Sequence, residues 1–266
     1  MTTHRMSIFD VDGTLCSLGR KLGEPLAPEV AEGLRSLENR GNRIVLATGR
    51  PAQFALGIAL GAGLNDPIII GDNGCVMSDM KAEKEIHIAE RPAEMERLMD
   101  EIASKYGESI YFAPNQVSCS IFPKEGMKLK GEIRRHIRKF VKSSGGSLKI
   151  FEHESAIDVT PGGVDKGVAT RMLMSLFGME RAGVSAVGNG TNDIPMFSEA
   201  GFCLIIGYDI EYPGAHHCDN ICEALRILEF SSSRPDVSWS YPLAEAWIGQ
   251  RKSIRRRIAI RRGIVA

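Results

Sequence analysis

Hydrophobic residues along the chain alternate between two patterns. Short, almost wholly apolar runs of strand length are followed by longer stretches in which apolar residues recur every three or four positions, as on one face of a helix. In the first part of the chain this predicts strands at 6–11, 43–47 and 67–70, and helices at 28–40 and from Pro51 onward. Apolar strands separated by helices indicate an α/β fold, with a parallel sheet covered by helices on both faces.

The pattern changes after residue 80 and returns after residue 160. The intervening segment predicts short strands and two helices, in the order of a small sheet with helices on one face. We therefore expect a discontinuous core of residues 1–79 and 161–230, an inserted α+β domain at 80–160, and a C-terminal tail at 231–266. The elements predicted after residue 80 are strands at 85–88, within 109–122, within 147–159, at 184–187 and at 202–206, and helices at 93–106, 130–142, 166–177, 192–199 and 219–230.

The composition limits the classes of function. The 266 residues include 33 basic and 33 acidic side chains, so a formal net charge of zero provides no overall field that would attract nucleic acid. A nucleic-acid partner is therefore disfavoured. No run approaches the roughly 20 uncharged apolar residues that span a bilayer. The N-terminus carries no hydrophobic signal segment, and we expect a cytoplasmic protein without a membrane span.

The six cysteines indicate neither a disulfide framework nor a zinc site. They are scattered without a Cys-x-x-Cys pair, which is typical of reduced thiols in a core. His216, His217, Cys218 and Cys222 have the side chains of a zinc site, but the adjacent histidines point in different directions. A second ligand pair at zinc-finger spacing is absent from the sequence around them, so a zinc role is disfavoured.

Two aspartates close the first predicted strand. Asp10 and Asp12 lie two residues apart, followed by Gly13 and Thr14, at the carboxyl end of the strand. Open α/β sheets bind their ligands at this edge. Asp, Gly and Thr are also ordinary turn residues, but three further polar segments fall at compatible places, and this combination favours a functional site.

The three further segments also follow strands or open helices. Thr48 and Gly49 come between the second strand and its helix, where a hydroxyl and free backbone N–H groups can hold an anion or simply cap the helix. Lys166 opens the helix after the insertion and could neutralise the same anion or be a surface charge. The turn at 188–193 is rich in oxygen donors, which suits magnesium, although it could also be a helix-capping turn.

With these four segments, the chain resembles the phosphatases of the haloacid dehalogenase superfamily. The resemblance covers about residues 5–230 and is closest to the branch of Cof-type sugar phosphatases, archaeal phosphoglycolate phosphatases and sucrose-phosphate phosphatases. It implies a Rossmann-like core, with an α/β cap inserted after the third core strand, where the pattern changes here. It also implies a Mg²⁺-dependent phosphoric monoester hydrolase that acts on a small organic phosphate, such as phosphoglycolate or a sugar phosphate.

The resemblance assigns a role to each of the matching residues. Asp10 is implied to be the nucleophile that forms an aspartyl-phosphate, and Asp12 the general acid and base. The residues implied to bind phosphate are Thr48, Gly49, Lys166 and Asn192, and those implied to bind the metal are Asp10, Asp12, Asn189 and Asp193.

One position departs from the family pattern. The family's fourth motif begins Gly-Asp, whereas this chain has Asn189 after Gly188. An amide oxygen can still coordinate Mg²⁺, but the site loses one negative charge and is expected to bind the ion more weakly. Asp193 is the obvious compensating residue. The alternative is a degenerate member of the family that binds phosphate without strong catalysis.

Two regions carry charge or polarity without a clear role. In the insertion, Tyr111, Asn115, Lys124 and Arg134 could touch a substrate, but the sequence does not separate them from surface residues. The tail holds eight basic and two acidic residues and both tryptophans. The tail pattern favours an amphipathic helix that docks on the core or on a second subunit, as in a homodimer, over an RNA or membrane anchor.

Overall fold

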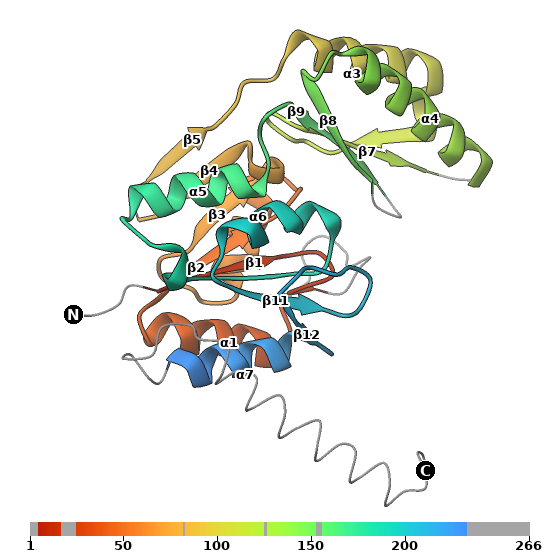
Figure 1. Cartoon of the computed structure of the whole chain (residues 1–266). Helices are drawn as coiled ribbons and strands as arrows, with labels where there is room; N and C mark the ends of the chain where they lie inside the picture. Colours follow the sequence, from red (N-terminus) through yellow and green to blue (C-terminus); the bar gives the residue numbers. More distant parts are fainter. Residues whose placement is uncertain (1–4, 17–24, 82, 125–126, 153–155, 233–266) are drawn as a thin grey trace, which may run out of the picture.

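The computed structural model describes residues 5–16, 25–81, 83–124, 127–152 and 156–232. Within them, eight strands form one large sheet in the order β12, β11, β10, β1, β2, β3, β4, β5 (Figure 1). The bounds of these strands are β1 Arg5–Asp10, β2 Asn42–Ala47, β3 Ile68–Gly71, β4 Val76–Asp79, β5 Lys84–His87, β10 Val184–Gly188, β11 Phe202–Ile206 and β12 His216–Cys218.

The six strands from β12 to β3 run parallel, and β4 and β5 are antiparallel additions at one edge. β1 lies between β10 and β2, with Phe9 opposite Val187 and Asp10 opposite Ala47. The carboxyl ends of these three central strands therefore meet at one edge of the sheet. We call this the catalytic edge, because Asp10, Thr48 and the turn after β10 all lie there.

Helices cover both faces of the large sheet (Figure 1). The apolar sides of α1, α2 and α7 bury one face, and those of α5 and α6 bury the other. The bounds are α1 Pro28–Asn39, α2 Ala52–Gly61, α5 Lys166–Leu176, α6 Ile194–Glu199 and α7 Ile221–Ser232, with short 3-10 turns η1 Asp72–Gly74, η3 Arg181–Gly183 and η4 Thr191–Asp193. This arrangement confirms the predicted α/β fold with a mostly parallel sheet.

A second, four-stranded antiparallel sheet follows the order β6, β7, β9, β8. One of its faces packs against α3 and α4 around a separate apolar cluster that includes Met95, Ile133 and Val159. We call this unit the small-sheet unit. Its elements are α3 Ala93–Tyr106, η2 Gly107–Ser109, β6 Ile110–Phe112, β7 Cys119–Pro123, α4 Met127–Ser143, β8 Leu148–Glu152 and β9 Ile157–Pro161.

Several elements differ from the sequence-based expectation. Two short strands were not predicted: β4, which lies between β3 and β5, and β12, which lies at the other edge of the large sheet. β5, grouped by the sequence with the insertion, extends the large sheet instead. Pro51 is the N-cap of α2 rather than its first residue. Residues 233–266 of the tail lie outside the described residues, so the predicted tail helix stays a prediction.

Candidate active site

A buried ion cluster lies at the catalytic edge. Lys166, the first residue of α5, donates to Asp10 Oδ1 at 2.6 Å and to Asp193 Oδ1 at 2.7 Å. The side chains of Lys166 and Asp193 are completely buried, and that of Asp10 is 7% exposed. Two carboxyl groups therefore share one ammonium away from solvent.

The environment makes the proton affinity of Asp10 unusual. Burial and the neighbouring carboxylate of Asp193 together raise the pKa of Asp10 to about 7, against the opposing effect of the Lys166 ammonium. The two carboxylates in turn raise the pKa of Lys166 despite its burial. An added cation near Asp10 would favour the charged carboxylate, which is the form that can act as a nucleophile.

Backbone geometry places Lys166 at this point. Asp165 caps α5 by accepting from the N–H groups of Gly167 and Val168 at 3.0 and 3.1 Å. The turn η1 packs against this helix end, and a Cβ at Gly74 would lie 2.2 Å from the carbonyl oxygen of Asp165. Gly74 also has φ +103°, so a glycine is required on both counts.

Asp193 is held by its own turn. Its Oδ2 accepts from the backbone N–H groups of Asn189 and Gly190, both at 2.9 Å, while its Oδ1 accepts from Lys166. Gly188 permits this turn, because a Cβ there would lie 2.5 Å from Asp193 Oδ2. Both oxygens of Asp193 are thus engaged by protein donors. The residue orients Lys166 and the loop, and its role as a metal ligand stays a prediction.

The carboxylate of Asp12 is gripped by an arginine. Arg50 donates from Nε and from its terminal nitrogen to the two oxygens of Asp12, each at 2.7 Å. Burial lowers the pKa of Arg50, but the hydrogen bonds and charge of Asp12 outweigh this effect and raise it overall. Asp12 remains 30% exposed, so it can still meet a substrate while Arg50 fixes its direction.

The loop after β2 is fixed beside Asp10 by hydrogen bonds of Thr48. Thr48 is 1% exposed, and its Oγ1 accepts from the backbone N–H of Arg50 at 3.1 Å. Its carbonyl accepts from the N–H of Asn73, whose Oδ1 in turn accepts from Asn192 Nδ2 at 3.3 Å. Thr48 and Asn192 are therefore linked through Asn73, next to Gly49, and Lys166 bonds to Asp193, the residue after Asn192.

Asn189 brings an amide to the same spot. One terminal atom of this amide lies 3.2 Å from Thr14 Oγ1, 3.1 Å from the carbonyl oxygen of Asp12 and 3.2 Å from Asp10 Oδ2. With nitrogen at this position, the amide donates to all three atoms. With oxygen there, Thr14 donates to it and three oxygens converge, from Asp10, Asp12 and Asn189.

The converging oxygens fit Mg²⁺, which prefers carboxylate, carbonyl and amide oxygens with some waters retained. Asp12 would contribute its backbone carbonyl rather than its carboxylate, which Arg50 holds. Among the described residues, no group of three His, Cys, Asp or Glu side chains has the arrangement of a metal site. The histidines and cysteines around β12 are among these residues, and His217 Nδ1 lies 2.8 Å from the carbonyl oxygen of Gly207.

The small-sheet unit reaches the catalytic edge through Asp158, Lys149 and Asn115, and the sequence had pointed only to Asn115. Asp158 of β9 accepts from Asn73 Nδ2 at 2.8 Å, and Lys149 of β8 donates to Asp165 at 2.9 Å. Asn115 donates to the carbonyl of Gly49 at 3.0 Å. No motif could have revealed these pairs, because their partners lie between 16 and 85 residues away in the sequence.

Asp72 accepts hydrogen bonds from the loop between β6 and β7. Its Oδ2 accepts from the backbone N–H groups of Val117 and Ser118 at 2.8 and 3.2 Å, and its Oδ1 accepts from Asn115 Nδ2 at 3.1 Å. Arg91 binds the other side of this loop through the carbonyl of Asn115 at 2.6 Å. Asp72 is fully buried, and burial raises its pKa although these hydrogen bonds oppose the shift.

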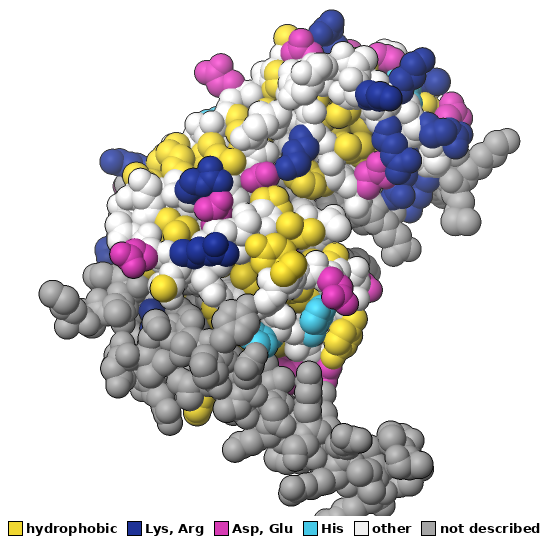
Figure 2. Space-filling model, in the orientation of Figure 1, with side chains coloured by type: hydrophobic (Ala, Val, Ile, Leu, Met, Phe, Trp, Pro, Cys, Tyr) yellow, Lys and Arg dark blue, Asp and Glu magenta, His cyan; other side chains and the backbone are white. Residues whose placement is uncertain are grey.

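The other polar candidates of the insertion do not approach the site. Tyr111 is 51% exposed and packs against Phe122 with ring centroids 6.0 Å apart. Lys124 is exposed, and Arg134 lies on α4. Figure 2 shows Lys and Arg side chains gathered over this part of the small-sheet unit. Of the four candidates, only Asn115 contacts the catalytic edge.

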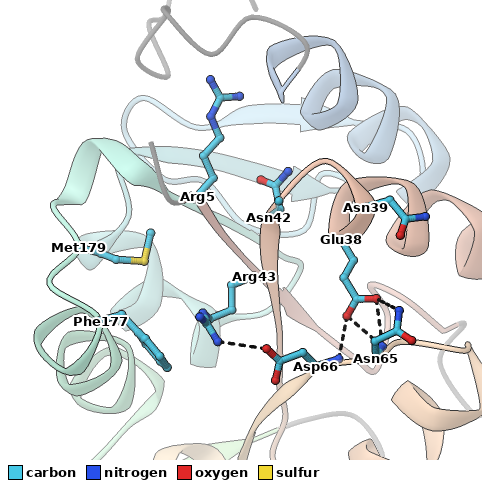
Figure 3. Close-up of a pocket in the computed structure, with 10 residues that line it drawn as sticks. Arg5, Glu38, Asn39, Asn42, Arg43, Asn65, Asp66, Phe177 and Met179 are labelled. Carbon is cyan, nitrogen blue, oxygen red and sulfur yellow. Dashed lines mark hydrogen bonds and ion pairs between the residues drawn. The ribbon is translucent and has the colours of Figure 1, made fainter. Parts of the chain in front are cut away.

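A pocket of about 440 Å³ lies at the other end of the central strands, where β1 and β2 begin (Figure 3). Its charged groups are already paired: Arg43 lies 3.6 Å from Asp66, and Glu38 accepts from the backbone N–H groups of Asn65 and Asp66 at 3.0 Å. None of the predicted catalytic residues lines it. The lining residues are Arg5, Glu38, Asn39, Gly41, Asn42, Arg43, Asn65, Asp66, Phe177 and Met179.

Comparison with known proteins agrees with this geometry. The family model of haloacid dehalogenase-like hydrolases matches residues 7–132 and 114–210. A phosphoglycolate phosphatase of Pyrobaculum islandicum is 30% identical over 197 residues, which cover 74% of this chain and 80% of the relative. One of Pyrobaculum aerophilum is 29% identical over 194 residues, covering 73% and 79%. The chain therefore belongs to the haloacid dehalogenase-like hydrolases.

Solved structures share the fold. A haloacid dehalogenase-like hydrolase from Bacteroides thetaiotaomicron has a TM-score of 0.68 at 20% identity, over 84% of this chain and 98% of the other. The C-terminal domain of a C. albicans trehalose-6-phosphate phosphatase has a TM-score of 0.71 at 15% identity, over 86% and 93%. The family match and the phosphoglycolate phosphatase relatives show that the chain is an enzyme of the phosphoric monoester hydrolase class. In the described part of the chain, none of the helices is long and apolar enough to cross a membrane.

Proposed function

We propose that the chain is a Mg²⁺-dependent phosphomonoesterase that transfers the phosphoryl group of a small organic phosphate to Asp10 and then to water. The observation that carries this proposal is the buried Lys166 ammonium, 2.6 Å from Asp10. Phosphoryl transfer depends mainly on positioning and on neutralising charge at the phosphoryl oxygens. A fixed, desolvated cation beside a carboxylate at the sheet edge supplies both.

In the first step, a carboxylate oxygen of Asp10 attacks phosphorus and the bond to the leaving oxygen breaks. The leaving alkoxide takes a proton from Asp12, which Arg50 keeps directed toward the site. Thr48, the backbone N–H of Gly49, Lys166 and Asn192 hold the phosphoryl oxygens. The products of this step are the free alcohol and an aspartyl-phosphate on Asp10.

In the second step, Asp12 acts as the base. It takes a proton from a water molecule, the water oxygen attacks phosphorus, and the bond between phosphorus and the Asp10 oxygen breaks. Inorganic phosphate leaves and both aspartates return to their starting state. An aspartate at position 12 suits hydrolysis, because it can serve as acid in the first step and as base in the second.

Asp10 Oδ2, the carbonyl oxygen of Asp12 and Asn189 Oδ1 are the groups that would hold Mg²⁺. When bound, the ion would neutralise charge on the phosphoryl oxygens and favour the ionised form of Asp10. Asn189 contributes no charge, so the site relies on a single carboxylate ligand. We therefore expect a weaker affinity for Mg²⁺ than a site with two carboxylates would have.

The family resemblance supports a small organic phosphate as substrate. The relatives named above are phosphoglycolate phosphatases, and one solved structure of similar fold is a trehalose-6-phosphate phosphatase domain. Phosphoglycolate and sugar phosphates are accordingly the two substrate classes to test first.

The test is hydrolysis of para-nitrophenyl phosphate across a Mg²⁺ titration, with a chelator control. The wild type should turn over in the presence of Mg²⁺, and Asp10→Asn should lower kcat by at least about 10³-fold because the nucleophile is lost. Asp66→Asn is a matched control, since Asp66 lines the pocket at the other end of the central strands and should be dispensable.

The alternative is a phosphate-binding protein without strong catalysis, which the uncharged Asn189 favours. Wild-type protein that hydrolyses neither para-nitrophenyl phosphate nor a panel of natural phosphate esters, at any Mg²⁺ concentration, would contradict the proposed enzyme. Retained binding of inorganic phosphate in that case would support the alternative.

A further inference from the structure

A carboxylate of the small-sheet unit lies directly over the catalytic edge. Asp158 alternates along β9 with Ile157 and Val159, which pack under the helices of the small-sheet unit. Its side chain consequently lies on the opposite face of the small sheet and bonds to Asn73 of the large-sheet part at 2.8 Å. Asp158 is only 5% exposed.

The Asp158 carboxylate touches the loop that holds the phosphoryl group. A Cβ built on Gly49 would lie 2.7 Å from Asp158 Oδ2, so the carboxylate is in contact with this glycine. Gly49 lies between Thr48, proposed to bind the phosphoryl group, and Arg50, which grips Asp12. Asp158 therefore lies close to both the phosphoryl-binding loop and the acid that protonates the leaving group.

The direction of the reaction brings the leaving group toward this carboxylate. In an in-line displacement, the leaving oxygen departs on the side of phosphorus opposite the nucleophile. Asp10 ends β1 of the large sheet, so we expect the alcohol part of the substrate to extend away from it, toward the small sheet. There, an ionised carboxylate accepts hydrogen bonds and repels anions.

We propose that Asp158 selects the leaving group, accepting a hydrogen bond from a hydroxyl of an uncharged alcohol and disfavouring a leaving group that carries a carboxylate. This inference rests on the proposed phosphatase function and narrows its substrate class. It favours phosphate esters of polyols or sugars over phosphoglycolate. Two negative charges about 6 Å apart at a partly buried site lower affinity about tenfold to hundredfold.

The experiment uses two substrates of almost identical size. Phosphoglycolate carries a carboxylate where 2-hydroxyethyl phosphate carries a CH₂OH group, so their difference isolates the charge of the leaving group. We expect the wild type to prefer 2-hydroxyethyl phosphate by about tenfold or more in kcat/KM. Asp158→Asn keeps an oxygen that can accept from Asn73 but removes the charge, and it should abolish most of this preference.

Two further variants serve as controls. Asp158→Glu retains the charge and should retain the preference. Glu152→Gln removes a carboxylate from the neighbouring strand β8, where Glu152 pairs with Arg138 of α4 rather than with the large-sheet part. The Glu152→Gln variant should keep the wild-type ratio. Thermal unfolding of each variant checks that the fold is intact.

Each outcome has one meaning. A wild type that hydrolyses phosphoglycolate as well as or better than 2-hydroxyethyl phosphate would overturn the role of Asp158, whether or not any variant folds. An unchanged ratio in Asp158→Asn would also overturn it. Absence of Mg²⁺-dependent hydrolysis of both substrates and of para-nitrophenyl phosphate would instead contradict the phosphatase function itself, and the selection would be abandoned with it.

Discussion

Two buried aspartates use the same hydrogen-bonding pattern for different purposes. Asp193 accepts through Oδ2 from the consecutive backbone N–H groups of Asn189 and Gly190, and Asp72 accepts through Oδ2 from those of Val117 and Ser118. Neither side chain is exposed to solvent. The difference lies in the second oxygen, which bonds to the Lys166 ammonium in Asp193 and to the neutral amide of Asn115 in Asp72.

Because of this difference, Asp193 belongs to a charged cluster beside Asp10, whereas Asp72 holds the small-sheet unit against the large sheet. The ammonium compensates the charge of Asp193 and also bonds to Asp10, beside which we propose that the phosphoryl group binds. The donors around Asp72 carry no full charge, so burial dominates and raises its pKa. The same acceptor pattern thus stabilises a charged site in one place and fastens the small-sheet unit to the large sheet in the other.

Among the substitutions that test this comparison, the largest effect is expected for Asp193→Asn. The substitution removes a hydrogen bond between charged groups in a fully buried position, which is worth up to about 3 kcal/mol of unfolding free energy. Because Lys166 would lose one of its two anchors, kcat/KM should fall by about 10- to 100-fold. Chemical denaturation and steady-state kinetics measure the two effects.

Glu199→Gln is the control for Asp193→Asn. Glu199 lies a few residues further on, at the end of α6, and pairs with the exposed Arg171. A surface pair of this kind contributes about 0–1 kcal/mol. Equal losses of stability or activity in the two variants would contradict a special role for the buried cluster.

A smaller, pH-dependent effect is expected for Asp72→Asn. A carboxyl group whose folded-state pKa is raised contributes stability below its unfolded pKa of about 3.9, and this contribution is lost as the pH rises through the folded value. The asparagine variant does not titrate. At about pH 4 the free energy of unfolding of the variant should be lower than that of the wild type by about 1 kcal/mol. As the pH rises from about 4, the melting temperature of the variant should therefore rise relative to that of the wild type.

Thermal unfolding of both proteins between about pH 4 and pH 8 measures this difference, since groups common to the two proteins cancel. A difference in melting temperature that does not change across this range would show that Asp72 has an ordinary affinity for protons. A difference that falls with rising pH would mean that the hydrogen bonds from Val117 and Ser118 outweigh burial.

The smallest effect is expected for Glu38→Gln. Glu38 also accepts from two consecutive backbone N–H groups, those of Asn65 and Asp66, but on the surface beside the pocket in Figure 3. Water can replace these bonds, so the free energy of unfolding should change by no more than about 0.5 kcal/mol, without loss of turnover. A loss comparable to that of Asp193→Asn would mean that the hydrogen-bond pattern, rather than burial, sets the stability.

Much of the catalytic edge could be predicted from the sequence, because it depends on local order along the chain. Apolar strands alternating with helices predict a parallel sheet, and such a sheet brings the residues after its central strands to one edge. The order of the elements alone was therefore enough to group Asp10 and Thr48, whereas Lys166 joined them only through the family resemblance. The hydrogen bonds of Asp193 could not be predicted in this way. Its Oδ1 accepts from Lys166, which lies 27 residues away in the sequence, while its Oδ2 accepts from the backbone of its own turn.

The contacts across the two sheets were decided only by the tertiary structure. Asp158 meets Asn73 across 85 residues, and Asp72 meets Val117 across 45. Pairs of this kind depend on how two separately packed units dock. They cannot be predicted from hydrophobic periodicity, because periodicity indicates only which face of each element is buried. The sequence by itself thus determined the fold class and the family motifs, whereas docking decided which side chains of the small-sheet unit lie at the catalytic edge.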